Sequence, residues 1–189
     1  MMLDLFDTPV LPGLAERPDI IDRSEEQMLI RRIDESDLKP FRFQGWTGKR
    51  FTTSFGWCYD FEAGKPMEAP PIPDWLEPFR DRAAHFVGLA PDLLIQALLI
   101  RYDPGAGIGW HRDRPVYEHI IGISLGEPAT MRFRQRRGEG FARASMPLEP
   151  RAGYHMSGGA RYDWEHSIAE MEMPRWSITF RSMANAYAR

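Results

Sequence analysis

Apolar residues recur at helical spacing in two segments of the first half of the chain. The segment DRSEEQMLIRRIDES carries an apolar stripe that predicts a helix over about residues 24–35. Ser24, with Gln27 three residues later, has the spacing of a capping box and is the predicted start of this helix. A second stripe runs through PDWLEPFRDRAAHFVGLAPD and predicts another helix, with Pro78 in its first turn. Both helices should bury their apolar faces against other elements.

The rest of the chain is predicted to form mainly short strands. RFTTSFGWCYDF is rich in aromatic and β-branched residues and predicts a strand, whereas the prolines of the following EAGKPMEAPPIP predict a loop. After residue 91, strands are predicted in LLIQALLIRYD, EHIIGISLG, TMRFRQ, RASMPLEP, AGYHMSG and RWSITFRSM. Short strands at regular spacing between turn signals are typical of a sandwich or a barrel. The predicted fold class is therefore α+β, mainly β, with the N-terminal helices packed beside an antiparallel core.

Composition places the chain among globular proteins. It has 189 residues, of which 43% are hydrophobic and 27% charged, enough for one domain with a sizeable core. No apolar run approaches the roughly 20 residues that span a bilayer, and the N-terminus lacks the pattern of a secretion signal. The single cysteine, Cys58, excludes an internal disulfide and a multi-cysteine metal cluster. We therefore expect a cytoplasmic protein without a membrane partner, most simply a monomer.

The charge is uneven along the chain. The formal net charge is -3, yet the stretch MRFRQRRGEGFARA contains five arginines and one glutamate. Such a run is often only a solvated hairpin. The alternative is an edge that contacts phosphates, because guanidinium groups match phosphate oxygens.

The stretch GIGWHRDRPVYEH contains the first candidate for metal chemistry. His111 and Asp113 are separated by one residue, so on a strand both would point to the same side. One imidazole nitrogen and one carboxylate oxygen form the mixed donor set that suits Fe(II). A His–Asp hydrogen bond at a strand end is the simpler explanation. A facial triad needs a second histidine, and the downstream candidates are His119, His155 and His166.

A second candidate is the segment RWSITFR near the C-terminus. Arg175 and Arg181 are six residues apart and so share one face of a strand, with the apolar Trp176, Ile178 and Phe180 on the other face. Two guanidinium groups pointing inward from a buried strand are costly without anions. A small dicarboxylate would satisfy both.

The order of these blocks, RYDPGAGIGWHRD, ISLG, SGGARYDWEHSI and RWSITFR, closely resembles the AlkB family of Fe(II)/2-oxoglutarate dioxygenases. The resemblance covers about residues 95–183. It implies a double-stranded β-helix, or jelly roll, within a single domain over residues 1–189. Residues 1–91 would form the N-terminal helices and substrate lid, and residues 92–183 the catalytic core. It also implies that His111, Asp113 and His166 form the metal triad.

The same resemblance assigns the cosubstrate site. Arg175 matches the arginine that holds the distal carboxylate of 2-oxoglutarate, Arg181 matches a second arginine near the other end, and Tyr102 matches a tyrosine that hydrogen-bonds the cosubstrate. One departure stands out. The DNA-repair type often has asparagine two residues before this tyrosine, where this chain has Ile100.

The activity that the resemblance implies is oxidation by Fe(II), 2-oxoglutarate and O2, and on an N-methyl group this releases formaldehyde. The expected substrate is alkylated DNA or RNA, with the aromatic and basic KRFTTSFGWCYDF as the lid that would stack the target base. A protein or small-molecule substrate is the alternative. A non-catalytic jelly-roll binding module is a further one, which the complete triad and both arginines oppose.

Overall fold

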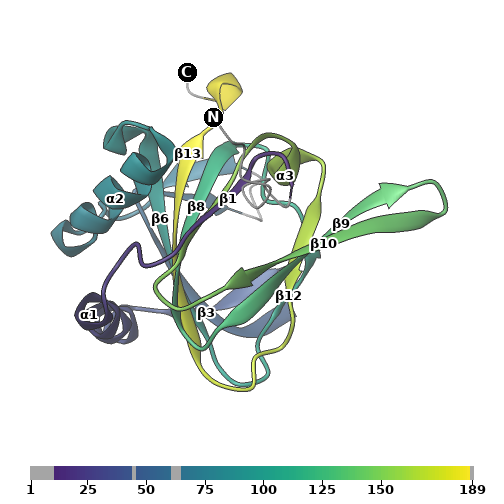
Figure 1. The fold of residues 1–189 in the computed structure, drawn as a ribbon. Helices are drawn as coiled ribbons and strands as arrows, with labels where there is room; N and C mark the ends of the chain where they lie inside the picture. Colours follow the sequence, from purple (N-terminus) through teal and green to yellow (C-terminus); the bar gives the residue numbers. More distant parts are fainter. Residues whose placement is uncertain (1–10, 44–45, 61–64, 188–189) are drawn as a thin grey trace, which may run out of the picture.

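Two antiparallel β-sheets face each other in the computed structural model, which describes residues 11–43, 46–60 and 65–187 (Figure 1). The larger sheet has seven strands in the order β1-β11-β8-β13-β6-β3-β2. Their bounds are Leu14–Arg17, Gly153–Met156, Tyr117–Gly126, Arg175–Met183, Leu94–Tyr102, Trp46–Phe55 and Lys39–Phe43. The smaller sheet has the order β10-β9-β12-β7. Its strands span Gly140–Leu148, Ala129–Arg137, Glu165–Ile168 and Ile108–His111.

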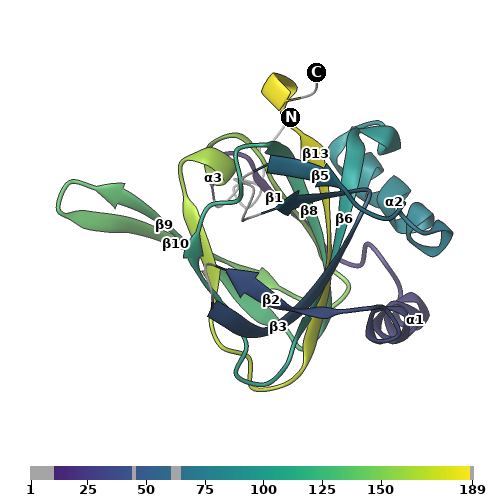
Figure 2. The same cartoon turned by 180° about the vertical axis from the view of Figure 1, so that it is seen from behind.

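Strands β6 to β13 make the jelly roll. Along the chain, β6, β8, β11 and β13 lie in the larger sheet, and β7, β9, β10 and β12 lie in the smaller one. The chain therefore passes repeatedly between the sheets and encloses a barrel. Seen from behind, β2 and β3 cross the front of this barrel, and the β9–β10 hairpin extends away from the helices (Figure 2). The predicted mainly β class and jelly roll are confirmed.

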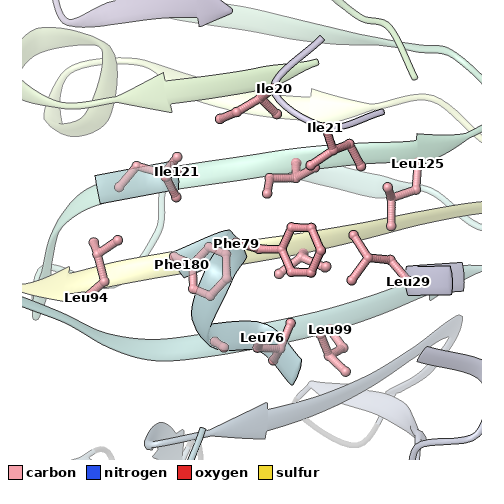
Figure 3. Close-up of a cluster of buried hydrophobic side chains, with 14 of the residues drawn as sticks. Ile20, Ile21, Leu29, Leu76, Phe79, Leu94, Leu99, Ile121, Leu125 and Phe180 are labelled. Carbon is pink, nitrogen blue, oxygen red and sulfur yellow. The ribbon is translucent and has the colours of Figure 1, made fainter. Parts of the chain in front are cut away.

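The helices cover the outer face of the larger sheet. Helix α1 spans Arg23–Asp34 and helix α2 spans Glu77–Val87, preceded by the 3-10 turn η1 at Asp74–Leu76. Leu29 of α1 and Phe79 of α2 pack with Phe180 of β13 in one buried cluster (Figure 3). The two apolar stripes seen in the sequence thus meet the apolar face of RWSITFR, as their periodicities predicted.

A second core fills the space between the sheets. It combines Ile100 and Tyr102 of β6 with Phe133 of β9, Met146 of β10 and Ile168 of β12. These side chains form the apolar interior between the two sheets. Among the described residues, no helix is both long enough and apolar enough to cross a membrane.

Two local predictions are wrong in detail. The cap of α1 is Asp22 rather than Ser24: the Asp22 carboxylate accepts the Glu25 N–H at 2.8 Å, and Glu25 accepts the Asp22 N–H at 2.9 Å. The Asp22 carboxylate forms the same kind of box two residues earlier in the chain. The proline-rich stretch also contains a strand. Strand β5, Lys65–Glu68, pairs with β4, Trp57–Asp60, in a two-stranded sheet.

Three shorter elements complete the fold of the described residues. Helix α3 spans Gly158–Tyr162, and the 3-10 turns η2 and η3 span Pro91–Leu93 and Asn185–Tyr187. Gly56, at φ 74°, interrupts the predicted strand 50–61 and separates β3 from β4. This is the left-handed backbone conformation that glycine adopts without strain.

Candidate metal centre

His111, Asp113 and His166 come together at the mouth of the barrel. One potential ligand atom from each side chain lies within 4.8 Å of the other two, so a single ion could contact all three. His111 ends β7 and His166 lies on β12, where the register sets the two residues directly opposite each other. Their ring centroids are 4.2 Å apart. The structure thus selects His166 from the three candidate histidines.

Asp113 is not brought to the site by the two-residue period of a strand, as its spacing from His111 had suggested. Strand β7 ends at His111, so Asp113 lies in the turn beyond the strand and the two-residue period of a strand does not place it. Its Oδ1 is 3.5 Å from His111 Nε2, and its side chain is 13% exposed. The three side chains do come together, but the loop after β7, rather than the strand itself, brings Asp113 to the site.

The protonation states suit a cation. The Gly109 carbonyl oxygen lies 2.9 Å from His111 Nδ1, and because a carbonyl only accepts, Nδ1 carries the proton and Nε2 is left as a donor to metal. Burial alone would raise the pKa of Asp113, but Arg181 and the two histidines hold that pKa well below its usual range. Burial, together with His111, lowers the pKa of His166 to about 4. The site thus offers the neutral imidazole of His166 and the carboxylate of Asp113 near neutral pH, with Nε2 of His111 as a further nitrogen ligand.

The other two candidate histidines contact each other instead. His119 Nδ1 and His155 Nε2 are 3.0 Å apart with nearly parallel rings, and His155 also packs edge-on against Phe86 of α2. This places the pair on the helix-covered side of the larger sheet. Neither residue joins the triad.

Arg175 is a buried cation inside the barrel. It is 1% exposed, and its Nη2 donates to Ser124 Oγ at 3.0 Å. Its Nε and Nη1 are buried and have no hydrogen-bond partner within the described residues, where Arg175 also forms no ion pair. Buried arginine donors are rarely left unpaired, so an anion would complete this environment. Tyr102 lies opposite Arg175 in the register, with Arg175 Cζ 5.1 Å from the ring centroid.

Arg181 lies between the triad and the sheet. Its Nη2 is 3.5 Å from Asp113 Oδ2, and its Nη1 donates to Gln96 Oε1 at 3.0 Å. Gln96 in turn donates to the Trp57 carbonyl. Arg181 therefore orients the triad carboxylate while keeping its position on the inner face of β13.

Several residues of the site were missed by sequence reasoning. Ser124 accepts a hydrogen bond from Arg175; it lies in the ISLG block, but no role was predicted for it. Arg161 of α3 is 3% exposed and donates to the main-chain carbonyls of Arg114 and Tyr117, which fixes the turn after Asp113. Tyr154 is buried in the inner core, and burial raises its pKa to about 12.

Two further predictions concern Ile100 and the expected lid segment. Ile100 is 6% exposed within the inner core, so an apolar side chain fills the position where the resemblance would place an amide. In the expected lid, Phe55 packs against the helix-covered core and is unsuited to stack a base, and Phe61, the last residue of this segment, lies outside the described residues.

The donor set fits Fe(II), and the unpaired Arg175 nitrogens fit a carboxylate. Two imidazoles and one carboxylate on one face are the 2-His-1-carboxylate arrangement of non-haem iron oxygenases, which leaves positions open for other ligands. These features define the class of metal-dependent dioxygenases: a jelly roll, such a triad, and a buried arginine inside the barrel.

Comparison with known proteins identifies the family. Residues 18–181 match the 2OG-Fe(II) oxygenase superfamily, and the chain belongs to that superfamily. Membership implies Fe(II), 2-oxoglutarate and O2, as the resemblance predicted. The predicted AlkB likeness is confirmed by relatives that carry AlkB-family names.

The chain is 28% identical over 166 residues to the Macaca fascicularis protein named tRNA (carboxymethyluridine(34)-5-O)-methyltransferase ALKBH8, covering 83% of this chain and 24% of that protein. It is 27% identical over 193 residues to the Arabidopsis thaliana protein named alkylated DNA repair protein ALKBH8 homolog, covering 88% and 54%. The chain thus spans about half or less of the length of these relatives.

Solved structures support the fold. The structure of OsALKBH1 superimposes with a TM-score of 0.68 at 15% identity, covering 90% of this chain and 96% of that one. A Pseudomonas putida prolyl-4-hydroxylase superimposes with a TM-score of 0.63 at 14% identity, covering 91% and 93%.

Proposed function

We propose that this chain is an Fe(II)/2-oxoglutarate-dependent dioxygenase that removes alkyl groups from nucleic acid. The observation that carries the enzymatic part is the triad, whose three ligand atoms lie within 4.8 Å of one another beside a buried, incompletely paired arginine. The nucleic-acid part is supported by the names of the relatives and by the concentration of arginines at 132–143.

In the proposed mechanism, His111, Asp113 and His166 would hold the iron. When bound, iron supplies the oxidation of a substrate C–H bond by O2, with 2-oxoglutarate converted to succinate and CO2. On an N-methyl group the product is an N-hydroxymethyl group, which breaks down to N–H and formaldehyde. Arg175 would bind the distal carboxylate through its guanidinium, whose Nε and Nη1 have no partner among the described residues.

Other side chains would prepare the site. Arg181 keeps Asp113 ionised and oriented, and the carbonyl of Gly109 fixes the tautomer of His111. Tyr102 would hydrogen-bond the cosubstrate from the strand beside Arg175. Ile100 would supply packing only, so the cosubstrate hydrogen bond of an asparagine would be absent or come from another group.

We extend the proposal to a monomeric, cytoplasmic enzyme with residues 1–189 acting as one unit. The single Cys58 rules out an internal disulfide, which supports a reducing compartment. Analytical ultracentrifugation tests the oligomeric state.

A substrate panel tests the reaction. The wild-type protein is incubated with Fe(II), 2-oxoglutarate and O2 together with N-methylated single-stranded DNA, RNA or a methylated peptide, and each product is weighed by mass spectrometry. Loss of the methyl group from DNA or RNA, with equal amounts of succinate and formaldehyde, is the expected result. Loss from the peptide alone would replace the nucleic-acid substrate with a protein one.

Matched histidine variants show whether the reaction uses this site. His166→Ala removes a triad residue and is expected to abolish turnover. His119→Ala removes a histidine from the helix-covered face, where it contacts His155, and is expected to retain turnover. Equal activity of the two variants would reject the triad.

A further inference from the structure

Four arginines gather on the outer face of the smaller sheet, behind the metal centre. On β9, Arg132 and Arg134 pair with Ser167 and Glu165 of β12, whereas Phe133 pairs with the triad residue His166. Because side chains alternate along a strand, the arginines lie on the face opposite to His166. Arg136 continues this row, and Arg143 of β10 lies opposite Arg134.

Two aromatic rings lie among these guanidinium groups. Arg134 Cζ is 4.5 Å and Arg132 Cζ 5.3 Å from the ring centroid of Trp110 on β7. Phe141 of β10 is 38% exposed, with Arg134 at 4.8 Å, Arg136 at 5.5 Å and Arg143 at 5.9 Å. We call this set the arginine–aromatic face; it consists of Trp110, Arg132, Arg134, Arg136, Phe141 and Arg143.

The positive charge of this face is mostly uncompensated. Arg134 pairs with Glu165 at 2.6 Å. Across the described ranges of the chain, Arg132, Arg136 and Arg143 form no ion pair; Arg132 donates only to Ser167 Oγ and Arg136 only to the Gly138 carbonyl. All three are exposed, in a chain whose net charge is -3. Within the described residues, Glu165 is the one acidic partner that this face has.

The arrangement suits a nucleic-acid strand, which offers both phosphates and flat bases along its length. An arginine stacked on an aromatic ring is held in position and still presents N–H groups at its edge for phosphate oxygens. Exposed aromatic rings offer surfaces on which bases stack. A peptide or small-molecule substrate would not require several cations spaced along a sheet.

The face also lies within reach of the active site. Trp110 directly precedes His111, so the arginine–aromatic face begins one residue from the triad on the edge strand β7. From there it continues along the β9–β10 hairpin, which projects from the barrel on the side away from α1 and α2 (Figure 1). A strand whose target base enters the mouth could therefore run over this edge and along the hairpin.

We propose that the arginine–aromatic face binds the single-stranded flank of the nucleic-acid substrate, through its phosphates and stacked bases. This assignment rests on the proposed function, since it names where that substrate is held. The face contributes binding and takes no part in the oxidation itself.

The test is a triple variant that leaves the Arg134–Glu165 pair intact. Arg132, Arg136 and Arg143 are replaced by glutamine, and the matched control replaces the exposed Arg23, Arg31 and Arg32 of α1 by glutamine. Both variants remove three positive charges from exposed positions on opposite sides of the larger sheet. Their thermal unfolding midpoints should stay close to that of the wild type.

Binding of a fluorescent single-stranded oligonucleotide is then measured over a series of salt concentrations. Three lost phosphate contacts should reduce the slope of log K against log salt by about 2, because each contact to a single strand contributes about 0.7. The control on α1 should retain the wild-type slope. A second variant, Phe141→Ser, should lower the affinity about fivefold, the smaller end of what one stacked base contributes.

Turnover separates this inference from the proposed function. For a methylated long oligonucleotide, the triple variant should raise KM and leave kcat unchanged, whereas for a methylated trinucleotide, too short to reach the hairpin, both constants should equal those of the wild type. Nucleic-acid turnover with equal KM in the triple variant and the α1 control would overturn the face and leave the proposed function standing. Absence of both turnover and binding of nucleic acid in the wild type would overturn both.

Discussion

Replacing Arg175 by methionine should stabilise the protein without cosubstrate and remove its response to 2-oxoglutarate. Arg175 is 1% exposed, and its Nε and Nη1 find no partner among the described residues. Its Nη2 donates a hydrogen bond to Ser124 Oγ at 3.0 Å. A buried guanidinium without a carboxylate has lost its hydration and gained little in exchange.

The expected changes in stability follow from the burial of Arg175 and from the binding of cosubstrate to the folded protein. Exchanging buried ionic groups for apolar residues of similar volume is often neutral or stabilising by about 1–4 kcal/mol. At this chain length each kcal/mol moves Tm by about 2–4 °C. In the wild type, cosubstrate at 100 times its Kd should add about 2.7 kcal/mol of stability, or about 5–10 °C in Tm. In the methionine variant this increase should vanish.

The assay is thermal and urea unfolding with Mn²⁺ in place of iron, with and without 2-oxoglutarate. Arg175→Lys is the matched control, because it keeps a buried cation and loses the planar fork. It should lose most of the cosubstrate response without the gain in stability. Isothermal titration calorimetry measures the affinity of the three proteins independently.

One outcome would refute this reasoning directly. If Arg175→Met were less stable than the wild type in the absence of 2-oxoglutarate and still gained the full Tm increase on adding it, Arg175 would be a structural residue and the cosubstrate would be held elsewhere.

Three further predictions concern the surrounding scaffold. Gly122→Ala should destabilise the protein by about 1–3 kcal/mol in urea unfolding, because a Cβ on β8 would collide with the ring of Tyr154; an unchanged midpoint would contradict this packing. Glu26→Gln should lower the free energy of unfolding by about 1–3 kcal/mol, since the buried Glu26 carboxylate pairs with Arg151 Nη1 at 3.0 Å, and an effect below 0.5 kcal/mol would reject the pair. Burial and His119 lower the pKa of His155 to about 4, so the unfolded chain binds more protons than the folded one between about pH 6.5 and 4. Stability should be complete above pH 6.5 and fall towards pH 4, and His155→Asn should show a smaller fall in its urea midpoint across that range.

Most of the sheet could be predicted because its strands carry their own pattern. RWSITFR alternates apolar and polar residues, and the structure buries Ile178 and Phe180 under the helices while Arg175 faces the barrel. Periodicity of two is a local property, so it can be read without knowing the partner strands. The two amphipathic helices are predictable for the same reason.

The assembly of the site could not be derived locally. His111 and His166 lie 55 positions apart in the sequence and are directly opposite each other only because β7 pairs with β12. By composition, His155 would have been an equally acceptable ligand. The resemblance to a known family, rather than spacing, singled out His166. Asp113 shows the limit of the spacing argument, since the turn after β7, held by Arg161, determines its position.

Residues that support other residues left no sequence signal. Ser124 and Gln96 accept hydrogen bonds from the two inner arginines, and the residues directly before and after each of them in the strand are apolar. Their roles depend on cross-strand neighbours, which become known only with the register. The strand β5 was missed for a related reason: Pro66 argues against a strand, yet proline is tolerated in a two-stranded sheet, which consists of edges.

The metal centre is tested most directly by anaerobic addition of Fe(II) and 2-oxoglutarate, followed by visible absorption. Chelation of protein-bound Fe(II) by the keto and carboxylate oxygens of 2-oxoglutarate gives a visible charge-transfer band, and it requires no knowledge of the substrate. The wild type and His119→Ala should develop this band at one iron per chain, and His166→Ala should not. A band of equal intensity in His166→Ala, or none in the folded wild type, would contradict the triad of His111, Asp113 and His166.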